Sequence, residues 1–143
     1  MKSRQKKLVT KIESGVRFTI DTLNVLVTVG SYLQGKTVFV SNDQWLRDAS
    51  WLRTKSPVKL PWEKAVYLAL SYLEDAQAGD LVFFIDLKDN FSAKIAELIY
   101  EGGVSRNLKL RIVESGSTDQ ALSEIAEGLI ATSDSWIIDQ SQV

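Results

Sequence analysis

The hydrophobic positions along the chain fall into short β-rich runs that alternate with segments of helical spacing. Two continuous apolar runs, residues 81–85 and 129–131, predict strands covered on both faces, because a half-exposed strand alternates apolar and polar side chains. Residues 108–113 show that alternation, as expected of a strand with one solvated face. Two further β-rich runs, at residues 16–20 and 36–40, bring the prediction to roughly five strands.

Helices are predicted between these runs. The clearest covers residues 61–74, where apolar residues recur at helical spacing behind Pro61, a residue suited to the first turn. Two more are predicted from their end signals: one from a Ser92 cap to the Gly102-Gly103 pair, and one from Ser117 to Gly128.

Two segments are less regular. Residues 24–34 fit both the alternation of a strand and the apolar face of a helix, and we predict a helix that Gly35 ends. Residues 41–60 lack clear periodicity and are expected to be irregular. The resulting alternation of strands and helices favours an α/β fold with a mostly parallel, doubly wound sheet. The 143 residues match a single domain over 1–143.

Charge is distributed unevenly along the chain, although the net charge is only −1. Residues 1–17 are strongly basic, whereas residues 112–143 contain acidic residues and no Lys or Arg. The basic segment over residues 1–14 is predicted to form a partly frayed helix. No apolar stretch suited to a signal peptide follows it, and no run approaches the roughly 20 residues of a membrane span. We therefore expect a cytoplasmic protein without a membrane partner.

The absence of His and Cys narrows the chemistry. It excludes disulfides, thiol catalysis and the usual triads that depend on His. Any bound metal must be held by oxygen, which favours Mg²⁺, Mn²⁺ or Ca²⁺ over zinc. No Gly-rich phosphate loop of the Walker type is present, so hydrolysis of a nucleoside triphosphate is not expected.

Several acidic residues occur where predicted strands end or a helix begins. If the first and last strands are neighbours in a parallel sheet, the acids that follow them meet at the sheet edge where α/β folds bind ligands. Asp is also common in turns and at helix starts, which is a purely structural alternative for each position. The acids are Asp21, Asp43, Asp86, Asp119 and Asp134.

The segment Asp21-Thr22-Leu23-Asn24-Val25-Leu26-Val27, with Asp119 before a helix and Thr132-Ser133-Asp134-Ser135 after the last strand, resembles the PIN-like superfamily of metal-dependent ribonucleases. Residues 20–24, 38–48 and 131–139 look closest to an uncharacterised prokaryotic branch related to the NYN nucleases. The resemblance implies a Rossmann-like, three-layer sandwich around a mostly parallel, roughly five-stranded sheet. It also implies an endonuclease that uses Mg²⁺ or Mn²⁺ to hydrolyse RNA and leaves 5′-phosphate products.

Residue roles follow from that resemblance position by position. Asp21 resembles the first metal ligand, and Asn24 resembles the residue that supports it. Asp119 and Asp134 resemble the acids of the penultimate helix and of the last strand end. Thr132 and Ser133 resemble hydroxyl residues that hydrogen-bond this group. The second acid of the superfamily has no unique counterpart, which leaves the number of metal ions open: the competing residues are Asp43, Asp48 and Asp86.

A segment of interleaved aromatic and basic residues follows the second predicted strand. Its tryptophans could stack bases or pack on the core, and its basic side chains could neutralise phosphates or remain solvated. The proposed phosphate contacts are Arg47, Arg53 and Lys55. The expected partner is RNA, single-stranded or structured, and a homo-oligomer is compatible with the sequence. The alternative to an endonuclease is a non-catalytic PIN-like module that binds RNA or protein.

Overall fold

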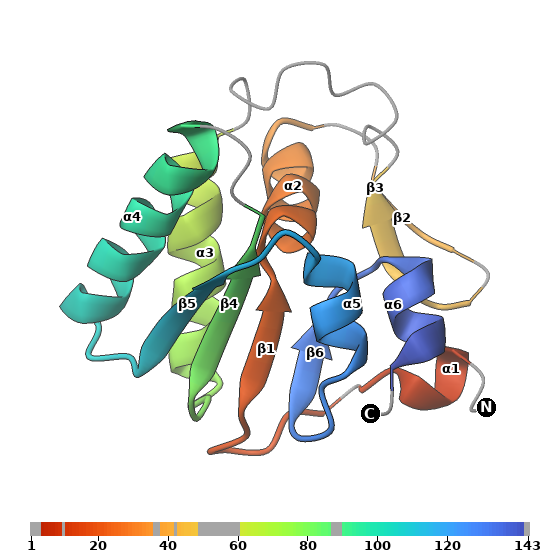
Figure 1. Cartoon of the computed structure of the whole chain (residues 1–143). Helices are drawn as coiled ribbons and strands as arrows, with labels where there is room; N and C mark the ends of the chain where they lie inside the picture. Colours follow the sequence, from red (N-terminus) through yellow and green to blue (C-terminus); the bar gives the residue numbers. More distant parts are fainter. Residues whose placement is uncertain are drawn as a thin grey trace.

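Four parallel strands form the central sheet of the computed structural model, in the order β5-β4-β1-β6 (Figure 1). The structure describes residues 4–9, 11–35, 38–41, 43–48, 61–86 and 90–141. The strands of this sheet are β1 (Phe18–Asp21), β4 (Leu81–Ile85), β5 (Leu110–Glu114) and β6 (Leu129–Ala131). Phe18 pairs with Leu81 on one side and with Leu129 on the other. The predicted α/β class with a parallel sheet is therefore confirmed.

The second predicted strand does not join this sheet. Instead, β2 (Val38–Val40) pairs antiparallel with β3 (Leu46–Asp48) in a separate two-stranded sheet. The central sheet thus has four strands within the described residues, and the prediction of roughly five was wrong. The strand β3 was also missed, because it is only three residues long and lies in a segment without periodicity.

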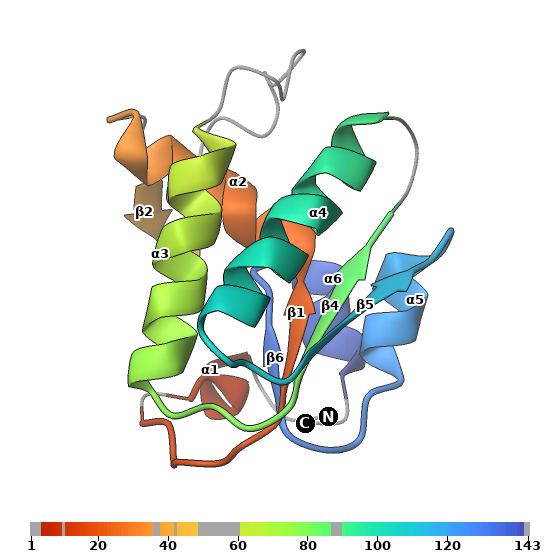
Figure 2. The same cartoon turned by 90° about the vertical axis from the view of Figure 1, so that its left-hand side faces the viewer.

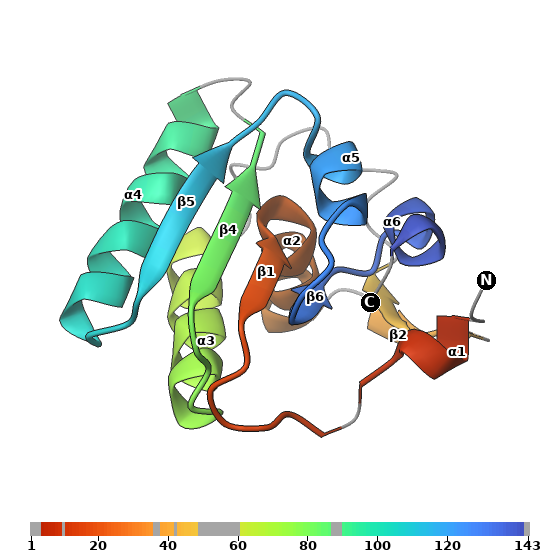
Figure 3. The ribbon, with the colours of Figure 1, turned by 60° about the horizontal axis from the view of Figure 1, so that its bottom comes forward.

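The helices cover both faces of the central sheet. Figure 2 shows α3 (Trp62–Asp75) and α4 (Asn90–Ser105) in front of the sheet, together with α2 (Thr22–Leu33), whereas α5 (Thr118–Ser123) and α6 (Ser135–Gln140) lie behind it. The short helix α1 (Arg4–Lys7) lies beside α6. Figure 3 shows the four strands side by side with their arrowheads pointing the same way. All their carboxyl ends therefore meet at one edge.

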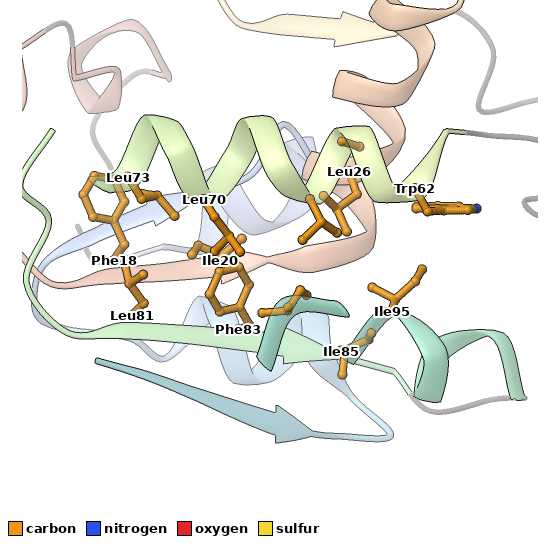
Figure 4. Close-up of a cluster of buried hydrophobic side chains, with 13 residues drawn as sticks. Phe18, Ile20, Leu26, Trp62, Leu70, Leu73, Leu81, Phe83, Ile85 and Ile95 are labelled. Atoms are coloured by element: carbon orange, nitrogen blue, oxygen red, sulfur yellow. The ribbon is translucent and has the colours of Figure 1, made fainter. Parts of the chain in front are cut away.

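The main core lies between the sheet and the helices α2, α3 and α4 (Figure 4). The strand β4 contributes a continuous apolar run, and β1 contributes Phe18 and Ile20 to this core while all four of its residues are buried, because both faces of these strands are covered. The helix α3 follows the predicted periodicity and buries one face. Its residues at the centre of this core are Trp62, Ala65, Val66, Leu70 and Leu73.

Helix ends depart from prediction where a glycine has a packing role. The helix α4 continues through Gly102 and Gly103 instead of ending there. A Cβ on Gly103 would lie 1.9 Å from Leu110 Cδ2, so glycine is needed for the close approach of α4 to β5. The helix α5 ends at Ser123, before Gly128. Gly128 directly precedes β6 and has φ +79°, and a Cβ at this position would lie 2.4 Å from the backbone O of Arg17.

Candidate metal centre at the carboxyl edge of the sheet

The chain reverses its progress across the sheet between β1 and β6. From β1 it moves outward through β4 to β5, and it then returns to place β6 on the other side of β1. Open α/β sheets bind ligands in the crevice outside the carboxyl ends of the strands at such a switch point. Asp21 ends β1, and Asp134 lies in the loop after the neighbouring strand β6. The two acids therefore approach this crevice from adjacent strands.

Hydrogen bonds connect the ends of β1 and β6. Thr132 Oγ1 donates to Asp21 Oδ2 at 2.7 Å, and the same hydroxyl oxygen accepts from the backbone N of Asp134 at 3.1 Å. Asn24 Oδ1 accepts from the backbone N and from Oγ of Ser133, at 2.8 Å and 3.2 Å. These are the residues to which the sequence assigns supporting roles, and the structure brings them together with both acids.

The other neighbour of β1 adds an acid to the same edge. Asp86 directly follows β4, and its Oδ1 accepts a hydrogen bond of 2.6 Å from Thr118 Oγ1. Thr118 is the buried first residue of α5, and Asp119 follows it at an exposed position. Four acids thus come from three strand ends and one helix start, and we call them the switch-point cluster: Asp21, Asp86, Asp119 and Asp134.

Asp21 lies at the buried centre of this cluster, with 8% of its surface exposed. The pKa of its carboxyl is raised from 3.8 to about 6, first by burial and then by the negative charges of Asp119, Asp134 and Asp86. The hydrogen bond from Thr132 opposes the shift by stabilising the carboxylate. Among the described residues, the groups that act most on this pKa include no Lys or Arg. A bound cation would stabilise the negative charge of the buried Asp21 carboxylate and reduce its repulsion with the neighbouring acids.

Asp134 also has a structural role. Its Oδ1 accepts from the backbone N atoms of Trp136 and Ile137, at 2.9 Å and 3.2 Å, and so caps the start of α6. The sequence did not predict α6. The cap orients the carboxylate by fixing one of its oxygens, and it leaves Oδ2 outside these two hydrogen bonds.

Asp43 lies elsewhere, in the turn between β2 and β3. Its carboxylate accepts from Ser41 Oγ and from the backbone N of Trp45, and it pairs with Arg4 at 3.1 Å. Arg4 also binds both carboxylate oxygens of Asp139 at 2.7 Å. We call Arg4, Asp43 and Asp139 the Arg4 clamp. Of the competing second acids, Asp86 joins the switch-point cluster, and Asp43 belongs to the clamp.

Several predicted residues cannot be placed at the site. Arg47 and Asp48 are residues of β3, and the structure describes their backbone but not their side chains. Arg53 and Lys55 lie outside the described residues altogether. Phosphate contact by these basic residues therefore stays a prediction.

The donor chemistry of the site fits a hard cation. Carboxylate, hydroxyl and amide oxygens occur together at this edge of the sheet, and such donors suit Mg²⁺ and Mn²⁺. Within the described part of the chain, no three acids are arranged closely enough to hold one ion by themselves. Mg²⁺ usually binds one or two carboxylates and completes its shell with water and phosphate oxygens. The site fits that open kind of coordination better than a closed protein cage.

Sequence reasoning did not find the contacts of Thr118 and Lys7. Thr118 donates a hydrogen bond to Asp86. Its position directly before the predicted acid Asp119 was the feature of the sequence that could have indicated this contact. Lys7 Nζ donates to the carbonyl oxygens of Ile138 and Ser141 at the end of α6, at 2.6 Å and 2.9 Å. Together with Arg4, Lys7 joins the basic start of the chain to its acidic end. The opposite charges of the two ends were the signal for that contact.

These features define an α/β protein with a Rossmann-like parallel sheet and a group of acids at its switch point. The chain belongs to the family described as Domain of unknown function (DUF5616), whose model matches residues 11–143. No curated protein and no solved structure matches the chain. Within the described residues, no helix has the length and apolarity needed to span a membrane.

Proposed function

We propose that this protein is a metal-dependent RNA endonuclease of the PIN-like type, a three-layer α/β sandwich that hydrolyses phosphodiester bonds in the cytoplasm. One observation carries the proposal. A buried carboxylate at the end of β1 is joined by hydrogen bonds to the loop after β6, and three further acids raise its pKa. Repelling acids around a buried carboxylate favour a cation.

The residues that would hold the cation are Asp21 and Asp134, with Asp86 and Asp119 as the next candidates. When bound, Mg²⁺ or Mn²⁺ stabilises negative charge on a phosphodiester and makes water a better nucleophile. Such chemistry suits a chain that has no His to act as a general base.

The chain's own residues orient the site. Thr132 fixes Asp21 Oδ2, and Asn24 holds the loop that carries Asp134 through its contacts with Ser133. The cap of α6 sets the orientation of the Asp134 carboxylate. Asp119 is exposed, which gives its carboxylate access to solvent and suits it to accept a proton from the attacking water.

Cleavage of labelled RNA tests the proposal. Single-stranded and structured RNAs are incubated with the protein and Mg²⁺ or Mn²⁺, and EDTA is expected to stop cleavage. Asp21→Asn and Asp134→Asn should each lose activity. Asn is a good helix cap, so Asp134→Asn removes the charge and preserves the start of α6. Asp139→Asn is the matched control outside the cluster and should cleave at a rate close to that of the unmodified protein.

A non-catalytic PIN-like module that binds RNA or protein is the second candidate. It is favoured by the hydrogen bonds of Asp134 Oδ1 to the start of α6, since they give this acid a structural reason to be present. RNA binding that survives EDTA, without cleavage by the folded protein, would support this candidate and exclude the endonuclease. Unchanged cleavage by Asp21→Asn would remove Asp21 from the catalytic site.

A further inference from the structure

The outer face of α3 exposes large apolar side chains along a groove. Leu68 is 43% exposed and Tyr72 is 58% exposed, although both line a cavity of about 390 Å³ that α3 shares with Val25 and Val29 of α2. Figure 2 shows α3 at the front of the molecule, with α2 beside it. Single exposed apolar residues are common on protein surfaces, whereas a contiguous apolar groove indicates a binding surface.

The charges along this face have opposite signs at its two ends. Lys64, Leu68, Tyr72 and Asp75 are exposed and follow one another at spacings of three or four residues, so they form one stripe along α3. Lys64 and Asp75 stand at the two ends, about 16 Å apart at 1.5 Å per residue. The apolar pair occupies the middle of the stripe.

We propose that a second copy of this chain docks on the groove, with the two α3 helices antiparallel about a twofold axis. In this arrangement Lys64 of each copy meets Asp75 of the other, and Leu68 packs beside the partner's Tyr72. A parallel arrangement would place Lys64 against Lys64 and Asp75 against Asp75. Twofold contacts of this self-complementary kind are the commonest in homo-oligomers. The charge pattern therefore selects both the occupant and its direction.

The other side of α3 is contacted by Arg106 at the end of α4, whereas the Leu68 and Tyr72 side faces the groove shared with α2. The Arg106 guanidinium lies 4.8 Å from the centre of the Tyr67 ring and donates to Ser71 Oγ at 3.0 Å. These contacts join α3 to the end of α4. The ridge of Leu68 and Tyr72, on the α2 side, can then enter the partner's groove as helix ridges do in packed helices.

The mass of the full chain in solution tests the dimer. Sedimentation equilibrium over a wide concentration range should show twice the chain mass of 16.0 kDa. Leu68→Glu should raise the dimer dissociation constant by about a hundredfold, because it places a charge at the centre of the interface. Val104→Glu is the matched control on α4, where Val104 is 59% exposed, and it should leave the constant unchanged. A monomer at all concentrations, or a dimer that tolerates Leu68→Glu, overturns the proposal.

Charge exchange tests the antiparallel direction. Lys64→Asp and Asp75→Lys should each raise the dissociation constant by about tenfold, because each replaces attraction with repulsion in both symmetric pairs. The double variant should restore a constant close to that of the unmodified protein. Lys94→Asp, an exposed change of the same charge on α4, should have no effect. Failure of the double variant to restore association contradicts the proposed contact. Since all these positions are exposed, circular dichroism should show an unchanged fold.

Discussion

Two groups of carboxylates in this protein have opposite electrostatic surroundings. In the Arg4 clamp, the Arg4 guanidinium lies between two acids, and its hydrogen bonds hold the pKa of Asp139 below its ordinary value. In the switch-point cluster, burial and three like charges raise the pKa of Asp21. The clamp brings its own cation and joins the two ends of the chain. The comparison teaches that acids of one residue type can tie a fold together or prepare a site for an external cation, depending on what faces them.

The largest expected difference between the two groups is in catalysis. Asp21→Asn should lower Mg²⁺-dependent RNA cleavage by about a hundredfold or more, because it removes the buried ligand from the proposed site. Asp139→Asn should change the rate by less than about threefold, since Asp139 belongs to the clamp. Rates from single-turnover assays on one labelled RNA provide the measurement. An equal decrease in cleavage rate in both variants would mean that the switch-point cluster and the Arg4 clamp do not differ in function as proposed.

The stability of the metal-free protein should depend on the charge of Asp21. The folded-state pKa is raised from 3.8 to about 6, so the folded state keeps its proton to a higher pH than the unfolded state does. The contribution of Asp21 to stability therefore falls as the pH rises from about 4 to about 6, by about 3 kcal/mol in total. The Asp21→Asn variant has no charge at this position, so its stability should not show this decrease with rising pH.

Urea unfolding in EDTA between pH 4 and pH 8 measures this effect as the difference between the protein and its Asp21→Asn variant. The variant should become the more stable of the two as the pH passes the window. A variant that is less stable at neutral pH would show that the Asp21 carboxylate stabilises the fold, contrary to its surroundings in the cluster.

Breaking the clamp should have a smaller effect with the opposite pH dependence. Arg4→Gln removes the partner that lowers the pKa of Asp139. The contribution of that pair is present above the ordinary pKa of Asp and is lost as the pH falls and the carboxylate is protonated. Arg4→Gln should therefore lower the melting temperature at neutral pH and not in acid. High salt should reduce the difference, because the pair is partly exposed. A difference that grows in acid would contradict this origin.

The sequence predicts that Asp21 and Asp134 lie at one edge of the sheet, because parallel strands end at one edge, and that they meet if their strands are neighbours, which the pairing of β1 with β6 confirms. The apolar residues identify both strands, Asp21 ends the first, and Asp134 lies three residues after the end of the second. The choice between Asp43 and Asp86 could not be made in this way, since it depends on which strand pairs with which. The run at residues 36–40 pairs with β3, a partner too short to predict, and its turn places Asp43 beside Arg4.

Glycine and tryptophan positions show a second limit of sequence reasoning. Gly102 and Gly103 were interpreted as a helix end, but they allow α4 to pack closely on Leu70 and Leu110. Trp136 is a large aromatic residue of the kind that fills cores, yet it is 50% exposed, because the unpredicted helix α6 turns it outward while Ile137 and Ile138 are buried. Local sequence identifies residues that can end a helix or fill a core, and only tertiary contacts decide which role they take.

Binding of Mn²⁺ at neutral pH, measured by isothermal titration calorimetry, tests the central claim most directly. The claim is that the switch-point cluster needs an external cation and the clamp does not. The unmodified protein and Asp139→Asn should bind Mn²⁺ with similar affinity, whereas Asp21→Asn should lose measurable binding. Mn²⁺ at about a hundred times its dissociation constant should also stabilise the first two by about 2.7 kcal/mol. Equal binding by all three proteins, or binding by none, would contradict the claim.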